Sequence, residues 1–580
     1  MRREQIDLSG PWRFQADPLN AGERLGYAAA DHDDAAWRRV DVPCCFDSCV
    51  PGLQGYLGVG WFRREVVLPA GWRGRRILLH FNGVNDHARV WVNGRFLGHC
   101  EDGFLPFEYP IHDQVEPGRP CTIAVAADNI VRKADVPGDQ RGWRGFGGIV
   151  RDVQLVATAQ QYIKSVRVTA EPRSDGGTLQ AHVALVNDTP DMIAEATLEC
   201  TICDAGGRAV VTLAPIHIRL APGAHEEVSF ASDVPGALPW SPAAPNLYTL
   251  DAGLSATGGE VDAVSTRFGF RRIEARGTRL LLNGEPIFLT GWNRHEDSPR
   301  TDLVPDLDLA RWDLMEMKGS GANFVRLCHY PHHPAEVDLC DEIGLLVMDE
   351  IPLYWWKGNQ DGEENCRAKL AAARRQVRAM VERDINHPSV IFWSVSNENH
   401  EQHPEVVAGN KELIRLAREL DDTRLCVHVS YMWTEHPAFD EDDVLCLNAY
   451  PSLTGAAERG AEFDLSDSTQ WWRENLERVH ALYPDKPIVI TEFGSCSLEG
   501  TRAGAYGEET AAAIIEVESA GMDAPYVRGA IVWCWADHAW PPLLGFQSLA
   551  VSPFGVLTRE RKPKAPFHTC RRLFKEKSTL

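Results

Sequence analysis

Two glutamates in this chain stand close after short apolar segments that are typical of buried strands. Glu398 follows the segment 390–395, and Glu492 follows the segment 487–490. Strands that are buried on both faces of a parallel sheet have this composition. In a (β/α)8 barrel the carboxyl ends of the strands carry the chemistry. The sequence therefore predicts that the two carboxyl groups meet on one rim of a barrel.

A pair of carboxyl groups on such a rim can hydrolyse a glycosidic bond. In a retaining enzyme one group protonates the leaving oxygen, the other attacks the anomeric carbon, and the two lie about 5–5.5 Å apart. A single glutamate after an apolar segment would more often be a solvated rim residue, but two in equivalent positions favour catalysis. We therefore predict that Glu398 and Glu492 are the catalytic pair of a retaining glycosidase. The neighbouring Asn397 can donate its amide to a sugar 2-hydroxyl.

Bulk properties narrow the class of protein. The chain has 580 residues, which is too long for one hydrophobic core, and a net charge of −23, which disfavours nucleic acid or an anionic membrane as a partner. No apolar segment approaches the roughly 20 residues that span a bilayer. The N-terminal residues lack the apolar core of a secretory signal, and the 15 scattered cysteines suit a reducing compartment. We expect a cytoplasmic protein without nucleic-acid or membrane partners.

The periodicity of the apolar residues divides the chain into three domains. Residues 1–160 show short β-rich segments, among them two joined by Asn93-Gly94, the strongest short signal for a hairpin. Residues 161–272 alternate with period two and predict an immunoglobulin-like sandwich. In residues 273–580 strand segments alternate with helical ones, such as 370–385, which predicts a (β/α)8 barrel. The eight expected barrel strands are 287–292, 323–327, 345–348, 390–395, 425–429, 444–447, 487–490 and 529–533.

Four short motifs lie at or near the ends of these expected strands. They are Asn293-Arg294-His295-Glu296-Asp297, Arg326-x-x-His329-Tyr330-Pro331, Ser396-Asn397-Glu398 and Thr491-Glu492-Phe493-Gly494. The set resembles glycoside hydrolase family 2, which contains β-galactosidases, β-glucuronidases and β-mannosidases. The resemblance covers nearly the whole chain. It implies an N-terminal β jelly-roll sandwich of the sugar-binding type, an immunoglobulin-like β-sandwich and a C-terminal (β/α)8 TIM barrel.

The resemblance also implies individual roles. Glu398 would be the acid/base, Glu492 the nucleophile and Asn397 the ligand of the 2-hydroxyl. For His295 and His329, which would contact sugar hydroxyls, a purely structural role stays open. The other implied residues are Tyr450, which would hydrogen-bond the nucleophile, Trp533, which would floor the pocket, and Arg326, Asp349 and Glu350, which would orient the carboxylates.

Two departures from the family pattern bear on substrate and metal. Family β-glucuronidases carry Asn-x-Lys before a Gly-aliphatic-aliphatic-Thr-Arg segment, and this pair grips the sugar carboxylate. Here the segment 555–559 is preceded by Ser552-Pro553-Phe554, and a phenylalanine cannot pair with a carboxylate. Large β-galactosidases carry a magnesium-binding Glu-x-His after the third strand, where residues 351–356 offer no such ligands. We expect no metal and no cofactor, and do not read the nearby histidines 329, 332 and 333 as a metal cluster.

The expected activity is that of a retaining exo-β-glycosidase that removes one terminal sugar from a small glycoside or oligosaccharide. The missing carboxylate grip makes a neutral, β-galactoside-like sugar the first expectation. The alternative is a β-glucuronidase or other β-uronidase that holds its acid differently, with Arg132, Arg141 or Arg144. An alternative of another class is a catalytically inactive carbohydrate-binding protein. A homo-oligomer, as a dimer or tetramer, is also compatible with this architecture.

Overall fold

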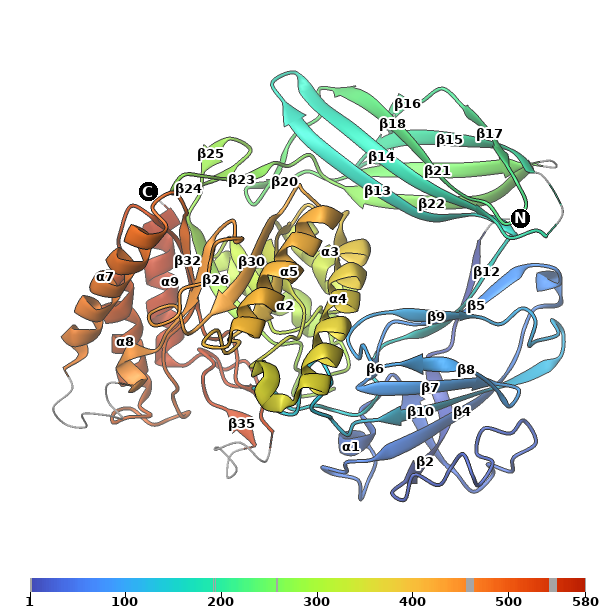
Figure 1. The fold of residues 1–580 in the computed structure, drawn as a ribbon, viewed down its shortest axis with the longest axis horizontal. Coiled ribbons are helices and arrows are strands. Elements are labelled where there is room, and N and C mark those ends of the chain that lie inside the picture. Colours follow the sequence, from blue (N-terminus) through green and yellow to red (C-terminus); the bar gives the residue numbers. More distant parts are fainter. Residues whose placement is uncertain are drawn as a thin grey trace.

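The computed structural model describes residues 3–190, 192, 194–256, 259–454, 464–541 and 550–578. Within them the chain forms three units, two built from antiparallel sheets and one from a closed parallel barrel. Figure 1 shows the first unit in blue at the lower right, the second in green above it, and the barrel to the left. The fold class expected from the sequence is confirmed.

The first unit is a sandwich whose two main sheets enclose an aromatic core. Trp12 and Phe62 of one sheet pack with Leu79 and Leu155 of the other. The hairpin at Asn93-Gly94 is present, and both residues have positive φ. One sheet contains, in order, β3 (Arg38–Val42), β2 (Gly10–Asp17), β4 (Val59–Val67), β10 (Pro120–Asp128), β7 (His87–Val92) and β8 (Arg95–Cys100); the other contains β1 (Glu4–Asp7), β12 (Val153–Thr158), β5 (Arg76–Phe81) and β9 (Phe107–Pro110); and β6 (Val84–Asn85) pairs with β11 (Gly148–Ile149).

The second unit packs two sheets of long strands with alternating buried residues. The alternation is clear in β15, where every second side chain from Ala194 to Ile202 is buried. One sheet has the order β13 (Gln161–Arg173), β14 (Gly176–Asn187) and β18 (His225–Pro235); the other has β16 (Ala209–Thr212) and β17 (Ile216–Leu220) beside β15 (Ala194–Asp204), then β21 (Tyr248–Ala256) and β22 (Gly259–Phe268).

The barrel closes from eight parallel strands, each near a segment expected from the sequence. Strand residues alternate between two environments: Phe324 and Met348 fill the barrel, whereas Val325 and Val347 pack against the helices. The strands are β26 (Leu289–Arg294), β27 (Phe324–Leu327), β28 (Leu346–Glu350), β29 (Val390–Asn397), β30 (Leu425–Ser430), β31 (Leu445–Asn448), β32 (Ile488–Phe493) and β33 (Val527–Val532).

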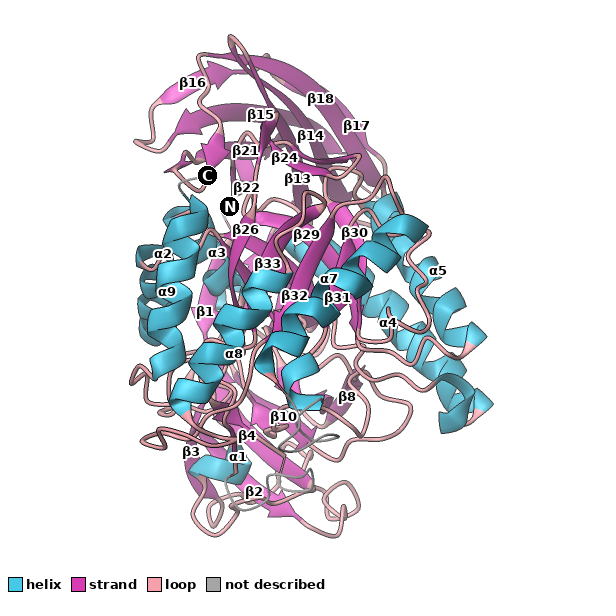
Figure 2. Ribbon diagram, turned by 90° about the vertical axis from the view of Figure 1, so that its left-hand side faces the viewer, coloured by secondary structure: helices cyan, strands magenta, loops and turns pink. Residues whose placement is uncertain are grey.

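Helices surround these strands, as Figure 2 shows. The helix expected at 370–385 is the later part of α4, which begins at Glu363, where two glutamates in the first turn favour a helix start. A small sheet closes the amino end of the barrel, with Leu280 packed among interior residues. The helices are α2 (Leu307–Gly319), α3 (Pro334–Ile343), α4 (Glu363–Asp384), α5 (Pro404–Leu420), α7 (Leu465–Leu482), α8 (Glu508–Gly521) and α9 (Ala565–Ser578), and the small sheet is β23 (Ile273–Arg276), β24 (Arg279–Leu282) and β25 (Glu285–Pro286).

Buried polar contacts fix the two β units against the barrel. Arg151, next to β12, forms an ion pair of 2.7 Å with Glu296, just after β26. Arg271, after β22, donates to the carbonyl oxygens of Pro388 and Val390 at the start of β29. The first unit therefore lies at the carboxyl-end rim of the barrel, and the second at the opposite end.

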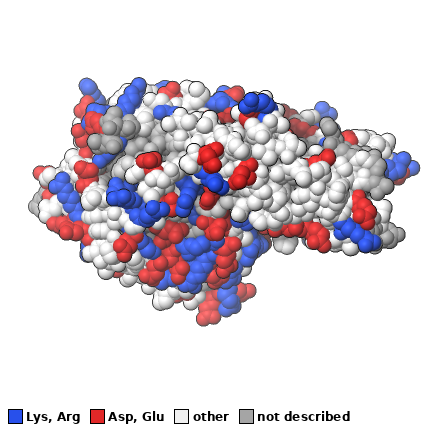
Figure 3. Space-filling view, turned by 90° about the horizontal axis from the view of Figure 1, so that it is seen from above, with Lys and Arg blue, Asp and Glu red and all other residues white. Residues whose placement is uncertain are grey.

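The surface of the molecule mixes charges of both signs. On the face in Figure 3, Lys and Arg side chains are interspersed with Asp and Glu side chains. Among the described helices, none combines the length and the apolar character needed to cross a bilayer.

Candidate active site

The carboxyl ends of the barrel strands gather polar side chains from six of the eight strands. Since the strands are parallel, residues near their ends meet on one rim. The side chains are Asn293 of β26, Arg326 of β27, Glu350 of β28, Asn397 of β29, Asn448 of β31 and Glu492 of β32, with Glu398 directly after β29.

Glu398 is half-buried at this rim and receives two uncharged donors. Its φ of +51° lies in the left-handed region, which a non-glycine residue rarely adopts outside functional sites. The indole Nε1 of Trp355 donates to one carboxyl oxygen at 2.8 Å, and the amide of Asn448 donates to the other at 2.9 Å. Burial raises the pKa of Glu398. The surroundings of this carboxyl therefore favour its protonated form.

Glu492 lies deeper and is only 4% exposed. The guanidinium of Arg326 donates to its Oε1 at 2.6 Å, and the hydroxyl of Tyr450 donates to its Oε2 at 2.7 Å. Burial, followed by the neighbouring charge of Glu398, raises the pKa of Glu492 to about 8. The cation and the hydroxyl act in the opposite direction and stabilise the ionised form.

The two carboxyl groups act as one titrating pair. Each is raised in pKa by burial, and the charge of Glu398 acts on Glu492 only when Glu398 is ionised. The pair therefore holds one proton near neutral pH. With Arg326 beside Glu492 and only uncharged donors beside Glu398, the form of the pair with the charge on Glu492 and the proton on Glu398 is accessible, although the raised pKa of Glu492 favours its protonated form below about pH 8.

Arg326 is the centre of the buried polar network. Its guanidinium binds both oxygens of Glu350, at 2.8 and 2.7 Å, as well as Glu492. It also donates to the side-chain oxygens of Asn293 and Asn397. Burial opposes ionisation of Glu350, but Arg326 lowers the pKa of that carboxyl below its usual range. One cation thus sets the orientation of two carboxylates and two amides.

Asn397 is oriented by this network and keeps a free donor. Its Oδ1 accepts from Arg326 at 2.7 Å and from Asn448 at 3.2 Å. These contacts leave the amide nitrogen as the outward donor. Within the described residues this buried nitrogen has no hydrogen-bond partner. An uncommitted N–H beside Glu398 is available to an oxygen atom of a ligand.

Aromatic rings form one wall of the site. The ring of Trp533, after β33, stacks on His329 with centroids 5.1 Å apart, and His295 lies 5.5 Å from Trp533. Burial lowers the pKa of His329 to about 4 and that of His295 well below its usual value, so both rings are neutral. His329 Nδ1 contacts Glu350 at 2.8 Å, whereas His295 Nε2 has no partner in the described part of the chain.

Asp349 is the one residue of the predicted set that lies apart from this cluster. Adjacent strand residues point to opposite faces, so Asp349 shares the helix-facing side of β28 with Val347, while Glu350 points inward. There its carboxyl lies against Asp384 of α4. Burial and Asp384 raise its pKa well above the usual value. Asp349 is therefore a buried residue behind the site.

Several site residues were not singled out from the sequence. Asn448 and Trp355, the two donors to Glu398, are examples. The position of Asn448 at the end of the sixth expected strand could have indicated it. Trp143 had no such signal, because it belongs to the β10–β11 connection of the first unit. Its ring lies 5.7 Å from that of His329 and 5.9 Å from that of His295.

The arginines of the same connection are held by carboxylates of the first unit. Arg141 forms two hydrogen bonds of 3.0 Å with Asp86. The other two pairs are Arg144 with Asp47 and Arg132 with Asp128. The connection does reach the site, but it contributes the ring of Trp143 and not the guanidinium groups considered from the sequence.

Phe554 lies beside Tyr450, the hydrogen-bond partner of Glu492. Its ring centroid is 6.0 Å from that of Tyr450, and both join a small apolar cluster with Trp533. The nearby Lys564 is 1% exposed in its side chain and is bound to Asp537 and the carbonyl of Ser497. Where family β-glucuronidases place a lysine, this site has an apolar ring.

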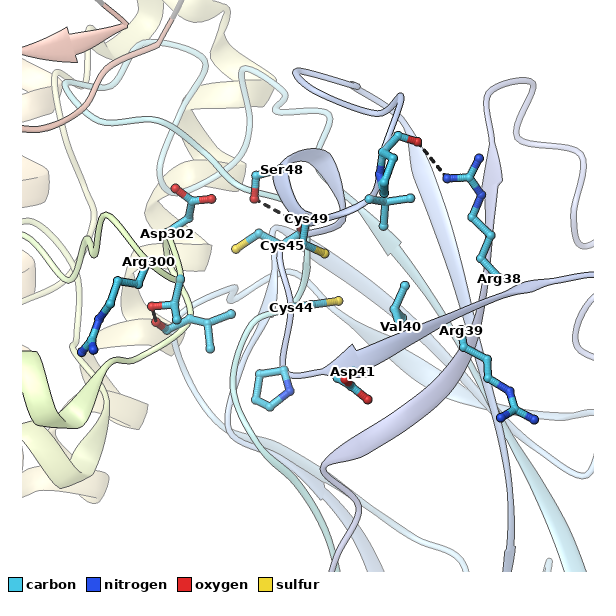
Figure 4. A pocket seen from close by; sticks show the side chains of 15 residues that line it. Arg38, Arg39, Val40, Asp41, Cys44, Cys45, Ser48, Cys49, Arg300 and Asp302 are labelled. Atoms are coloured by element: carbon cyan, nitrogen blue, oxygen red, sulfur yellow. Dashed lines mark hydrogen bonds between the residues drawn. The ribbon is translucent and has the colours of Figure 1, made fainter.

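Two cavities lie near the rim. One, of about 520 Å³, includes Glu398, Asn448 and Tyr450 in its lining. The other, of about 480 Å³, lies between the first unit and the barrel segment 300–304. Figure 4 shows its three cysteines, Cys44, Cys45 and Cys49. No residue of the carboxylate pair or its network lines this second cavity.

The residues present fit a resident metal poorly. The magnesium of family β-galactosidases needs oxygen ligands after the third strand, where Ile351 and Leu353 are buried apolar side chains. Elsewhere at the site His295, Cys328 and His329 offer atoms within 4.8 Å of one another. Burial raises the pKa of the Cys328 thiol well above its usual value, which opposes the thiolate that binds metals. No step below depends on a metal.

Fold and site together define a barrel glycosidase with two accessory β units. Family models for glycosyl hydrolases family 2 match in chain order: the sugar-binding domain over residues 26–159, a second domain over 161–271, and the TIM barrel domain over 273–576. The chain belongs to glycosyl hydrolases family 2. It is a retaining glycoside hydrolase with exo-β-glycosidase activity, as the sequence predicted.

Curated relatives and solved structures extend this comparison. A β-glucuronidase of Paenibacillus borealis is 27% identical, with 97% of this chain and 96% of the relative covered, and the mouse β-glucuronidase is 28% identical, with 97% and 89% covered. A β-galactosidase of Priestia megaterium is 29% identical over 92% of this chain but only 51% of the relative. The β-glucuronidase structure from Ruminococcus gnavus superposes with a TM-score of 0.88 at 24% identity, covering 99% and 98% of the two chains.

Proposed function

We propose that Glu492 is the nucleophile and Glu398 the acid/base of a double-displacement reaction. The contact of Arg326 with Glu492 is the observation that carries this assignment, because a cation stabilises the ionised carboxylate that must attack. Glu398 receives uncharged donors only and lines the open cavity, where a leaving group can depart. The assignment agrees with the roles expected from the family resemblance.

In the first step, Glu398 gives its proton to the glycosidic oxygen as a Glu492 oxygen bonds to the anomeric carbon. The bond to the leaving group breaks and a glycosyl–enzyme ester forms. In the second step Glu398, now ionised, takes a proton from water, and that water displaces Glu492. Asn397 donates to the 2-hydroxyl in both transition states, and Tyr450 and Arg326 hold Glu492 in line.

We propose a β-linked glucuronide, or a related uronide, as the substrate. The β-glucuronidases of Paenibacillus borealis and mouse match this chain over most of both lengths, whereas the β-galactosidase matches over about half of its own length, which favours this alternative over the galactoside first expected. The uronate cannot be held by a lysine at position 554. Two buried nitrogens at the aromatic wall of the site, His295 Nε2 and Trp143 Nε1, lack partners among the described residues. They are available to the oxygens of the sugar.

A neutral sugar is the second candidate. Phe554 beside Tyr450 favours it, as do the arginines Arg141 and Arg144, which already have carboxylate partners. An uncharged hydroxymethyl group costs less to bury beside a phenyl ring than a carboxylate does. A glucuronide and a glucoside differ only at the sugar's C6 substituent, and a galactoside differs from them also in configuration at C4.

A panel of 4-nitrophenyl β-glycosides separates the candidates. It contains the glucuronide, galacturonide, galactoside, glucoside and mannoside, each tested with the wild type, Glu492→Gln and the exposed control Glu382→Gln. We expect uronide cleavage that is lost in Glu492→Gln and kept in the control. Cleavage of neutral sugars alone would favour the second candidate. Full activity of Glu492→Gln would overturn the assignment of the nucleophile, which a 2-deoxy-2-fluoro glycoside can label for peptide mass analysis.

A further inference from the structure

The cavity of about 520 Å³ lies on the Glu398 side of the site. Glu492 lies deeper and is not among its lining residues. Because the acid/base protonates the leaving oxygen, the space beyond Glu398 is where the leaving group must lie. The lining residues are Gln140, Trp355, Lys357, Glu398, His400, Tyr431, Thr434, Asn448, Ala449, Tyr450, Pro451, Thr454 and Trp471.

Lys357 is fixed at the edge of this cavity by its backbone neighbours. The N–H of Trp355 donates to the carbonyl of Asn397 at 3.1 Å, and the N–H of His400 donates to the carbonyl of Trp356 at 3.0 Å. The side chain of Trp356 is fully buried. The segment before Lys357 is therefore hydrogen-bonded to the end of β29 and to the residues after it, with one isolated parallel bridge between Tyr354 and Asn397. Trp355, which contacts the acid/base, lies two residues before the lysine.

The charge of Lys357 has no counter-ion in the described part of the chain. Its ammonium donates to the neutral amide oxygen of Gln140 at 2.6 Å, and it takes part in no ion pair of the described residues. Among the described residues that line the cavity, it is the one lysine or arginine. Burial, with Lys357 contributing, lowers the pKa of His400, so that neighbour is uncharged.

Lys318 and Lys486, which are also half-buried in the barrel, likewise form no ion pair with the described residues, but each donates to two or more backbone carbonyl oxygens. Three further lysines of the barrel have a carboxylate partner. Lys369 pairs with Asp361, Lys411 with Asp440, and Lys564 with Asp537. A partly desolvated ammonium is costly unless an anion accompanies it. At Lys357 the space for that anion is the cavity itself. The aromatic residues Trp355, Tyr431 and Trp471 line the same space, and aromatic side chains suit a flat or ring-shaped group.

We propose that this cavity is the leaving-group subsite and that Lys357 binds a carboxylate on the leaving group. The substrate is then a β-glycoside whose leaving group is an acidic sugar or an aromatic acid. This inference rests on the proposed function, because it takes Glu398 as the acid/base. With a net charge of −23 the protein as a whole does not attract such an anion, so the recognition is local.

Matched substrates test the inference. We would compare kcat/KM for the 4-carboxyphenyl and 4-carbamoylphenyl glycosides of the preferred sugar, which have the same shape but differ in charge. Wild type and Lys357→Met are compared, with Lys577→Met on α9, which pairs with Asp523, as the control. We expect the carboxyl-to-carbamoyl ratio to fall about tenfold in Lys357→Met, as for loss of one charged hydrogen bond, through KM. An unchanged ratio would overturn the inference.

A second pair of substrates and a binding assay complete the test. Disaccharides with a uronic acid or a neutral sugar as the leaving residue show whether the acid is a sugar or an aromatic group. Calorimetric binding of the two phenyl glycosides to Glu492→Gln, with and without Lys357→Met, requires no turnover. A charge preference in binding that depends on Lys357 supports the subsite even if the catalytic assignment fails. Equal binding of both glycosides overturns the subsite even if the enzyme is active.

Discussion

Arg326 donates from Nη1 to Oε1 of Glu492 at 2.6 Å, with the arginine fully buried and the glutamate 4% exposed. The same guanidinium binds both oxygens of Glu350. A single cation thus compensates two buried carboxylates, and in the absence of either partner a buried charge would lack compensation. This arrangement stabilises the ionised form of Glu492 against burial, which still raises the pKa of that carboxyl to about 8.

Replacement of Arg326 tests this relationship. Arg326→Met should lower kcat/KM by about a thousandfold or more and destabilise the barrel by about 3–5 kcal/mol. Arg326→Lys keeps a charge but not the bidentate contact, so its fold should survive. Without the full contact, the pKa of Glu492 rises and the acidic limb of the pH profile moves to higher pH. The profile of kcat/KM is the measurement; an unmoved limb contradicts the role, and Arg374→Lys on α4 is the control.

The free amide nitrogen of Asn397 leads to a second prediction. Asn397→Ala should lower kcat/KM on the natural sugar on the order of a hundredfold, because a contact to the 2-hydroxyl strengthens in the transition state. A 2-deoxy glycoside lacks that hydroxyl, so wild type and variant should differ little on it. Equal losses on both substrates would show that Asn397 only supports the network. Asn475→Ala on α7, where the side chain bonds to Trp471, is the control.

Much of the fold could be predicted because each barrel strand is a short, strongly apolar segment. The expected segment 487–490, for example, overlaps the start of β32, which begins at Ile488. The site residues that lie at the carboxyl ends of the expected strands could be predicted. They include Glu398, Glu492, Arg326 and Asn397. The side of the strand was harder to assign. Asp349 and Glu350 both end β28, yet the alternation of side chains turns one to the helices and the other to the pocket.

Contacts between the first unit and the barrel could not be predicted from local sequence patterns. Trp143 reaches His329 from another sheet sandwich, and no local pattern links two residues so far apart in the chain. The arginines beside it seemed suited to an acid, but Asp86 and Asp47 already bind them. Charge in a sequence shows that a cation is present and does not show whether its partner is a ligand or the protein.

The raised pKa of Glu492 predicts a cost in stability. A carboxyl whose pKa moves from 4.5 to about 8 on folding binds more protons in the folded state between those pH values. The free energy of unfolding then falls as the pH rises through this window. Glu492→Gln has no titrating group at this position. The free energy of unfolding of the variant minus that of the wild type should therefore be larger at pH 8 than at pH 5, by more than about 1 kcal/mol.

Thermal unfolding of both proteins at pH 5 and pH 8 measures this difference. The exposed Glu382→Gln on α4 serves as the control. If the offset of Glu492→Gln were the same at both pH values, Glu492 would be ionised in the free enzyme throughout. The proton of the pair would then reside on Glu398 with no cost at position 492.

The position of Trp143 leads to the prediction that the first unit takes part in turnover. Its ring touches those of His295 and His329, and Gly142 beside it accepts a hydrogen bond from His538 at 3.1 Å. Trp143→Ala leaves a gap beside His295 and His329 in the aromatic wall of the site. We therefore expect kcat/KM to fall roughly 10–100-fold, as for misplacement of a bound substrate. Trp143→Phe should lose less. Trp312→Ala, 43% exposed on α2, is the matched control. Unchanged kinetics in Trp143→Ala would contradict a role of this ring in holding the sugar.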